Sequence, residues 1–341
     1  MSKTIYAALS VLLWSLSLPE PARADGAPLF SFPAQCEVGK TCFIFKYLDA
    51  DAGPGYHDFN CSLRSSDGHK GTDIAITDPQ DITPVKVLAA ADGVVVGIRD
   101  SLPDNPVGIV NFPEGQNCGN GVRIDHGDGW TTQYCHLRNG KVKVRNGQTV
   151  KRGRVIGFLG NSGQTERPHL HFQIEKNGVP VDPFTGKLNT SKSTCAKDKV
   201  DLAARSLWTD SAQNKVRLYR PYVIEYIGLS TRVINMETLL QRRQPASGAV
   251  GDPLMIVYSS VLGARKGTTL AMDILDPDNE TFFSHTETYE KGRARQYRYG
   301  GKKRPDGALF KSGAWTARVT ISGNGLSGPY EETRTATFTV N

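Results

Sequence analysis

Residues 167–172 read RPHLHF, and this segment indicates which fold to expect. Polar and apolar residues alternate from His169 onward, which predicts a β-strand. Successive side chains of a strand point to opposite faces, so His169 and His171 share one face. Short strands of this kind, separated by glycine turns, recur from residue 67 to about 186. The pattern predicts an antiparallel, barrel-like β domain.

A second segment, DGHKGTDIA at residues 67–75, adds two candidate metal ligands. His69 and Asp73 lie four residues apart, and Gly71 between them lets the chain bend so that both side chains converge. Together with the HLH segment they supply two imidazoles and one carboxylate, the ligand set of a catalytic zinc site with an open fourth position. Zinc in such a site lowers the pKa of its bound water to about 7 and polarises a carbonyl group.

A third segment, QYCHL at residues 133–137, carries a further histidine, His136. A lone HxH pair is a weak signal, and a single histidine is more often a packed or surface residue. The three segments together favour a metal centre over that alternative. The chain has no HExxH motif, so no glutamate on a helix is available as general base.

These segments resemble the lysostaphin-type zinc endopeptidases, also called LytM-domain peptidases. In that family a histidine is followed after three residues by an aspartate, then by Tyr-x-His-Leu and finally by His-x-His. The resemblance covers residues 67–186 and includes the flanks of the three segments. The matching flanks are Pro84-Val85, Ala91-Asp92-Gly93-Val94, the stretch from Gly121 to Gly129, the stretch from Gly153 to Gly157, and the stretch from Gly178 to Pro183.

The resemblance implies a fold, a cofactor and a site. The family fold is an antiparallel β structure of the duplicated-hybrid-motif type with a substrate groove across it. One zinc ion per chain is implied, held by His69, Asp73 and His171. His136 and His169 are the implied catalytic residues, one as general base and the other as oxyanion stabiliser or proton donor. The sequence does not assign these two roles between them.

The function expected from this resemblance is that of an exported zinc metalloendopeptidase that hydrolyses amide bonds in peptidoglycan cross-links or stem peptides. The main alternative is a non-catalytic, wall-binding activator of cell-wall amidases, because some LytM domains have lost their metal ligands. All the ligands and both other histidines are present here, which favours the enzyme. A secreted protease acting on proteins or glycine-rich peptides is a third reading.

The first 24 residues are expected to be a signal peptide. Lys3 precedes an apolar run at residues 5–18 that is too short to span a bilayer, and Ala22 and Ala24 fit a signal-peptidase site. No later stretch reaches 18 apolar residues, so we do not expect an integral membrane protein. The expected location is the periplasm or the extracellular space.

Export predicts that the six cysteines form disulfides, for which 15 pairings are possible. A simple two-residue turn at Asp128 and Gly129 would set Cys135 opposite Val122, so a bridge from Cys135 to Cys118 requires residues 119–121 to fold back. The remaining pair follows by elimination. The predicted bridges are Cys36–Cys42, Cys118–Cys135 and Cys61–Cys195.

The predicted organisation is all-β, with a C-terminal β-sandwich after the peptidase domain. Alternation from Trp315 to Ile321 indicates half-buried strands of an immunoglobulin-like sandwich. Because this domain has its own strands, we expect it to be dispensable for bond cleavage. The predicted segments are 1–24 (signal peptide), 25–66 (loop-rich with a disulfide hairpin), 67–188 (LytM-type zinc peptidase), 189–220 (linker or packing segment) and 221–341 (sandwich).

A net charge of +7 indicates an affinity for polyanions such as cell-wall polymers. No basic stripe with interleaved aromatic residues appears, so we expect no nucleic-acid partner. The expected partner is peptidoglycan, and the C-terminal domain could bind a protein of the cell wall.

Overall fold

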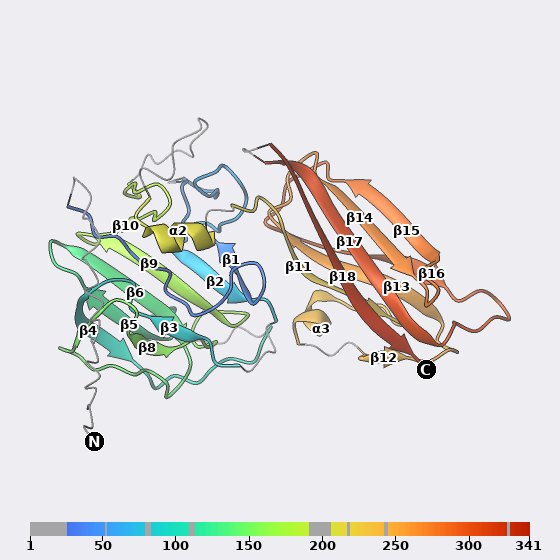
Figure 1. Ribbon diagram of the computed structural model, residues 1–341, viewed down its shortest axis with the longest axis horizontal. Coiled ribbons are helices and arrows are strands. Elements are labelled where there is room, and N and C mark those ends of the chain that lie inside the picture. The colour runs from blue at the N-terminus through green and yellow to red at the C-terminus, as the bar shows by residue number, and fades with distance from the viewer. Residues whose placement is uncertain are drawn as a thin grey trace, which may run out of the picture.

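The computed structural model is almost entirely β-structure and contains two bodies that lie side by side (Figure 1). We call the described residues up to 219 the N-terminal body and those from 220 onward the C-terminal body. The predicted signal peptide at residues 1–24 lies outside the described part. The structure describes residues 26–51, 53–78, 83–108, 113–190, 206–216, 219–241, 245–325 and 328–341.

The N-terminal body is built on an antiparallel sheet with the order β1-β2-β9-β6-β5-β4-β7, and β10 pairs with β9. A short pair, β3-β8, lies beside it, and helix α2 follows. The predicted all-β fold is thereby confirmed. The elements are β1 (Cys42–Lys46), β2 (Thr72–Ile76), β3 (Lys86–Leu88), β4 (Gly93–Arg99), β5 (Asn120–Asp125), β6 (Trp130–Leu137), β7 (Thr149–Val150), β8 (Val155–Phe158), β9 (His169–Lys176), β10 (Val179–Val181) and α2 (Asp210–Val216).

One apolar core holds this body together and reaches beyond the three sequence segments. Phe30 near the start and Trp208 near the end are both fully buried, and they form a β-bridge to each other. Trp208 also stacks on Phe172 of β9. The loop-rich N-terminal segment therefore packs into the same core as the sheet and contributes its edge strand, β1.

Two of the predicted disulfides, Cys36–Cys42 and Cys118–Cys135, are confirmed. The strand register at the second bridge differs from the simple prediction, because Val122 pairs with Tyr134 and not with Cys135. The turn between β5 and β6 is longer than two residues, and the pairing shifts again next to Asn120. Cys61 is also disulfide-bonded, but Cys195 lies outside the described residues, so that pairing stays a prediction.

The C-terminal body has its own core between two sheets, with the orders β11-β13-β16 and β12-β18-β17-β14-β15. The predicted alternation holds on β17, where Trp315, Ala317, Val319 and Ile321 are all buried. The immunoglobulin-like type of this sandwich stays a prediction. Its elements are β11 (Val223–Ser230), α3 (Met236–Leu240), β12 (Ser247–Gly248), β13 (Leu254–Leu262), β14 (Thr269–Leu275), β15 (Thr281–Thr288), β16 (Arg295–Lys303), β17 (Gly313–Gly325) and β18 (Gly328–Val340).

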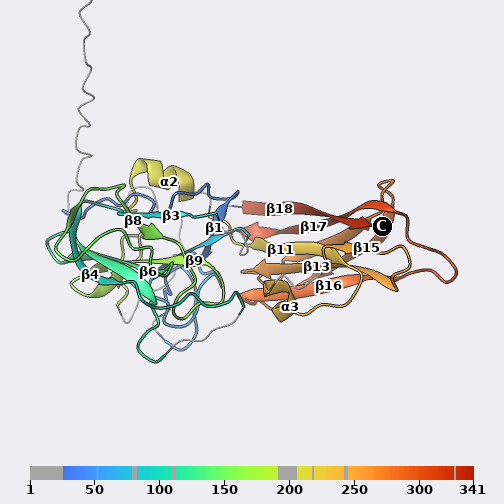
Figure 2. The same cartoon turned by 90° about the horizontal axis from the view of Figure 1, so that it is seen from below.

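The two bodies meet through a third, smaller core and a buried ion pair. Figure 2 shows β1 and β11 near the junction, where Phe43 and Phe45 pack with Val223 and Leu262. Beside them the guanidinium of Arg167 donates to Glu225, and both side chains are fully buried.

Glu225 sits at a bulge in β11, where the pairing with β13 shifts by one residue. Its carboxylate also accepts hydrogen bonds from Ser260 and Arg295. Since Arg167 lies two residues before His169, the C-terminal body is held against the strand that carries the HLH segment.

Substituting Glu225→Leu should strongly destabilise the protein, because it leaves the Arg167 guanidinium buried without a carboxylate. Loss of one partner of a buried pair costs about 3–5 kcal/mol of unfolding free energy. Urea unfolding measures this loss. Lys151→Met, which breaks the exposed pair with Asp92, is the control and should cost about 0–1 kcal/mol. Equal losses in the two variants would contradict the role given to the buried pair.

Candidate metal centre and groove

The strand register brings the HLH segment and the first segment together. Asp73 of β2 lies directly opposite His171 of β9 in the antiparallel pair. His69 lies in the turn before β2 and reaches the same point from the side. A Cβ atom at Gly71 would lie 2.5 Å from the carbonyl oxygen of Phe172 and 2.9 Å from the His171 ring. Gly71 lies at a bend in the chain, as expected from the sequence, and its lack of a side chain also permits close approach to β9.

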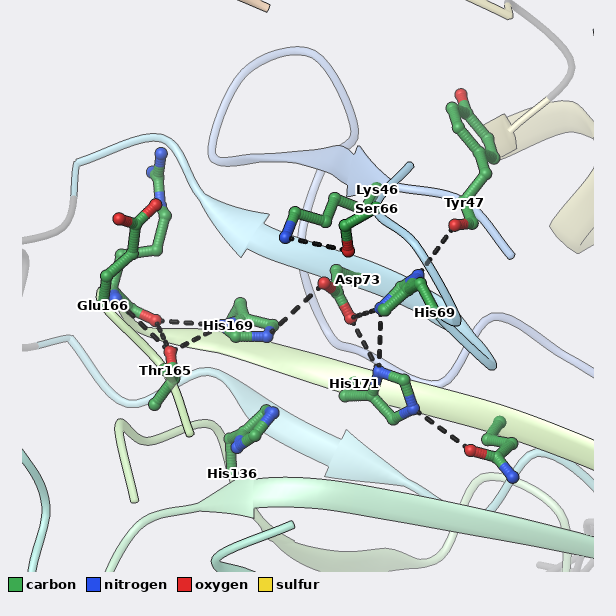
Figure 3. Close-up of polar contacts among 12 residues, drawn as sticks. Lys46, Tyr47, Ser66, His69, Asp73, His136, Thr165, Glu166, His169 and His171 are labelled. Carbon is green, nitrogen blue, oxygen red and sulfur yellow. Dashed lines mark hydrogen bonds and ion pairs between the residues drawn. The ribbon is translucent and has the colours of Figure 1, made fainter. Parts of the chain in front are cut away.

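Three atoms that can bind a metal converge at this point (Figure 3). Asp73 Oδ1 lies 3.0 Å from His69 Nε2 and 2.8 Å from His171 Nδ1. The two nitrogens lie 3.2 Å apart. Residues His69, Asp73 and His171 are those that the sequence predicts as zinc ligands, and we propose them in that role.

The outer nitrogen of each ligand ring also has a polar partner. His69 Nδ1 lies 2.7 Å from the carbonyl oxygen of Tyr47, which can only accept, so this nitrogen bears the hydrogen. His171 Nε2 lies 3.3 Å from the side-chain oxygen of Gln173, and the amide of Gln173 is oriented by its bond to Glu175. His69 Nε2 is then unprotonated in the neutral ring, and His171 Nδ1 is either unprotonated or donates to Asp73.

The electrostatics of the three residues favour a positive charge between them. Burial opposes ionisation of Asp73, but His69 and His169 outweigh it and hold the pKa of this carboxyl well below its usual value. Burial also disfavours the charged form of His171, yet Asp73 raises the pKa of this imidazole. The group attracts a cation, and its two nitrogens and one carboxylate oxygen suit zinc.

The other two predicted histidines lie against this group. The rings of His136 and His169 are 4.5 Å apart between centroids, and both side chains are buried. His169 Nε2 lies 3.6 Å from Asp73 Oδ2, while its Nδ1 lies 2.9 Å from the carbonyl oxygen of Arg167. His136 Nδ1 lies 2.8 Å from the carbonyl oxygen of Ser162. Each carbonyl fixes the hydrogen on Nδ1 and leaves Nε2 free to accept a proton.

Burial also keeps these two histidines neutral. It lowers the pKa of His136 well below the usual value, and the neighbouring His169 and His171 act in the same direction. It lowers the pKa of His169 as well, although Asp73 acts in the opposite direction. A neutral imidazole with a free Nε2 is the form that can act as a general base.

His136 has an unusual backbone conformation, with a φ of 61°. Left-handed backbone at a residue other than glycine stores strain and is enriched at active sites. The neighbouring Cys118–Cys135 bridge and the bond from the His136 amide to the Cys118 carbonyl hold the conformation. Apart from Cys135 next to His136, no residue pattern in this segment indicates the conformation.

A groove of about 560 Å³ is lined by all five predicted side chains. Residues that the sequence did not single out also line it, among them Phe45 and Lys46 of β1 and Glu166 beside β9. The predicted groove is present. The three remaining histidines lie elsewhere: His57 contacts the Asp58 carbonyl, His126 contacts the Asp92 carbonyl and Thr132, and His285 lies on β15.

Residues 67–183 match peptidase family M23. This segment is an M23 peptidase domain of the LytM type. The resemblance seen in the sequence is confirmed for this part of the chain. Within the described residues, no helix combines the length and the apolar character that a membrane crossing needs.

Several named proteins are similar to this segment. The peptidoglycan DD-endopeptidase ShyA of Vibrio cholerae is 35% identical over 137 residues, covering 40% of this chain and 27% of ShyA. The DD-carboxypeptidase/endopeptidase Mpg of Neisseria meningitidis is 36% identical over 149 residues, covering 44% of this chain and 29% of Mpg. A zinc-containing peptidase from Vibrio cholerae of known structure is 25% identical, with a TM-score of 0.29, covering 46% of this chain and 39% of that one. The chain thus spans less than a third of the length of these two curated relatives.

Variants of the five site residues should fall into two classes according to how much zinc the purified proteins contain. His171→Ala and Asp73→Ala each remove a proposed ligand, so the purified variants should lose most of their zinc. His136→Ala and His169→Ala should keep it, because a three-ligand site leaves its fourth position to water. Elemental analysis of the folded variants measures this. A His136→Ala variant without zinc, beside a His171→Ala variant with zinc, would refute the assignment.

Proposed function

We propose that this protein is an exported zinc endopeptidase that cuts amide bonds in the peptide part of peptidoglycan. The observation that carries the proposal is the convergence of three potential ligand atoms, from His69, Asp73 and His171, beside two buried histidines in one open groove. The M23 identity of residues 67–183 supports it, as do relatives named for peptidoglycan cleavage. Because the chain covers less than a third of those relatives, the activity of the whole protein is our inference.

In this proposal one zinc ion is held by His69, Asp73 and His171. Zinc bound there would polarise the peptide carbonyl and lower the pKa of water to about 7. Tyr47 and Gln173 fix the orientation of the two ligand rings through hydrogen bonds to their outer nitrogens.

His136 and His169 are the proton-transfer and charge-stabilising residues in this proposal. One Nε2 accepts a proton from the attacking water, and a proton passes to the leaving nitrogen, so that water and amide become a carboxyl group and an amine. The other imidazole stabilises the negative charge that develops on the carbonyl oxygen. Both rings are held by backbone carbonyls, so neither needs to reorient for the reaction.

The non-catalytic alternative, an activator of cell-wall amidases, is not favoured. Such a protein would not need a complete set of ligand and proton-transfer side chains, and all five are present here in one groove. Export is supported by the two disulfides, because such bonds form and persist in oxidising compartments. We propose the periplasm or the extracellular space as the location.

Purified protein should release muropeptides cut at a peptide bond from isolated sacculi, as read by mass spectrometry. A chelator should abolish release, and added zinc should restore it. His136→Ala and His169→Ala should each lower the rate by about a hundredfold or more, the scale for loss of a positioned acid–base group. His285→Ala, on the distant strand β15, is the matched control and should keep full activity.

A zinc-loaded protein that leaves sacculi and their soluble peptides uncut would contradict the proposal. Products cleaved in the glycan strands would contradict it as well, since they require a different chemistry.

A further inference from the structure

Strand β1 places the positively charged side chain of Lys46 in the groove, although the strand precedes the M23 segment in the sequence. The pairing of β1 with β2 is regular up to Ile44 and then shifts, so that Lys46 and not Phe45 lies opposite Asp73. Such a bulge inserts one residue and re-aims the side chains around it. Phe45 and Lys46 both line the metal groove as a result.

A second pocket of about 230 Å³ opens next to the groove. The two share Phe45, Lys46, Ser66 and Glu166 in their walls, so a chain lying in the groove can reach both. The far wall of the second pocket comes from the C-terminal body, through Leu262, Ala294 and Arg295. The pocket is thus formed jointly by segments on both sides of the M23 match.

Cations outnumber carboxylates in this pocket, whose charged lining residues are Lys46, Arg64, Arg295 and Glu166. Glu166 is already paired, because its carboxylate lies 2.6 Å from Arg295. Arg295 also pairs with Glu225. Arg64 is buried and donates to the backbone carbonyls of Ile44, Phe45 and Arg220. The Arg64 guanidinium is thus occupied by backbone carbonyls, and the charge of Arg295 is offset by two carboxylates.

Lys46 is different. Its ammonium donates to the hydroxyl of Ser66 at 3.3 Å and lies over the ring of Phe45. Within the described part of the chain, no carboxylate oxygen comes within ion-pair distance of it. Figure 3 shows Lys46 and Ser66 beside the histidine–aspartate group. A half-buried ammonium with one neutral partner keeps two N–H donors for an anion.

We propose that the second pocket is a substrate subsite that binds a carboxylate-bearing residue of the peptide, with Lys46 as the group that pairs with the carboxylate. Phe45 and Leu262 contact the aliphatic part of that residue. This inference rests on the proposed endopeptidase function, and it adds a preference for acidic peptides. It also gives the C-terminal body a part in substrate selection.

The test compares two synthetic peptides, each with blocked ends, that differ only in one glutamate replaced by glutamine. Zinc-loaded full-length His169→Ala protein binds without turnover, and calorimetry measures the affinity. The glutamate peptide should bind about tenfold more tightly, the scale of one charge-assisted hydrogen bond. Lys46→Met in the same background should remove the preference, whereas Lys46→Arg should retain it.

Lys303→Met, which removes an exposed ammonium at the far end of β16, is the matched control and should retain the preference. A preference that survives in Lys46→Met, or that is absent from the parent protein, overturns the subsite. The endopeptidase is tested separately with wild-type protein on sacculi. Cleavage without any carboxylate preference overturns only the subsite, and a Lys46-dependent preference without cleavage overturns only the endopeptidase.

Discussion

The convergence of three potential ligand atoms, on His69, Asp73 and His171, is the constraint on which the rest of the site depends. The antiparallel register of β2 and β9 sets Asp73 against His171, and Gly71 lets the two strands come close enough. The outer hydrogen bonds to Tyr47 and Gln173 fix the orientation of the two rings. A bound cation would stabilise the three converging atoms together, in keeping with the metal site that we propose.

The fold class and the five candidate site residues that line the groove could be predicted from the sequence, because these predictions depend on local signals. Strand alternation and glycine turns are visible residue by residue, and so is the spacing of the histidines. Strand β1 could not be predicted in this way. Its sequence, CFIFK, is almost wholly buried and shows no alternation, and it follows a stretch rich in turn formers. The bulge that aims Lys46 likewise has no sequence signal, since a register exists only between two strands.

The C-terminal body shows a second limit of structure prediction from the sequence. Its own strands and core led to the expectation that it is dispensable for cleavage. That expectation stays a prediction. Arg167 and Glu225 are buried against each other across the boundary, next to the strand of His169 and His171, so removal of the C-terminal body would leave Arg167 without this carboxylate. Composition shows how many charged residues a chain has, but not which of them lose contact with water on folding. That depends on tertiary packing.

The position of β1 also bears on how this protein could have arisen and how it can be recombined. The M23 match begins at residue 67, yet the sheet that carries the metal centre ends on a strand from residues 42–46. A cassette cut at the limits of the match would leave β2 as a bare sheet edge, with unpaired backbone groups and an uncovered Ala75 face. Exposed edges of this kind promote aggregation. A chimera built from this protein therefore needs to carry the preceding strand together with the M23 segment.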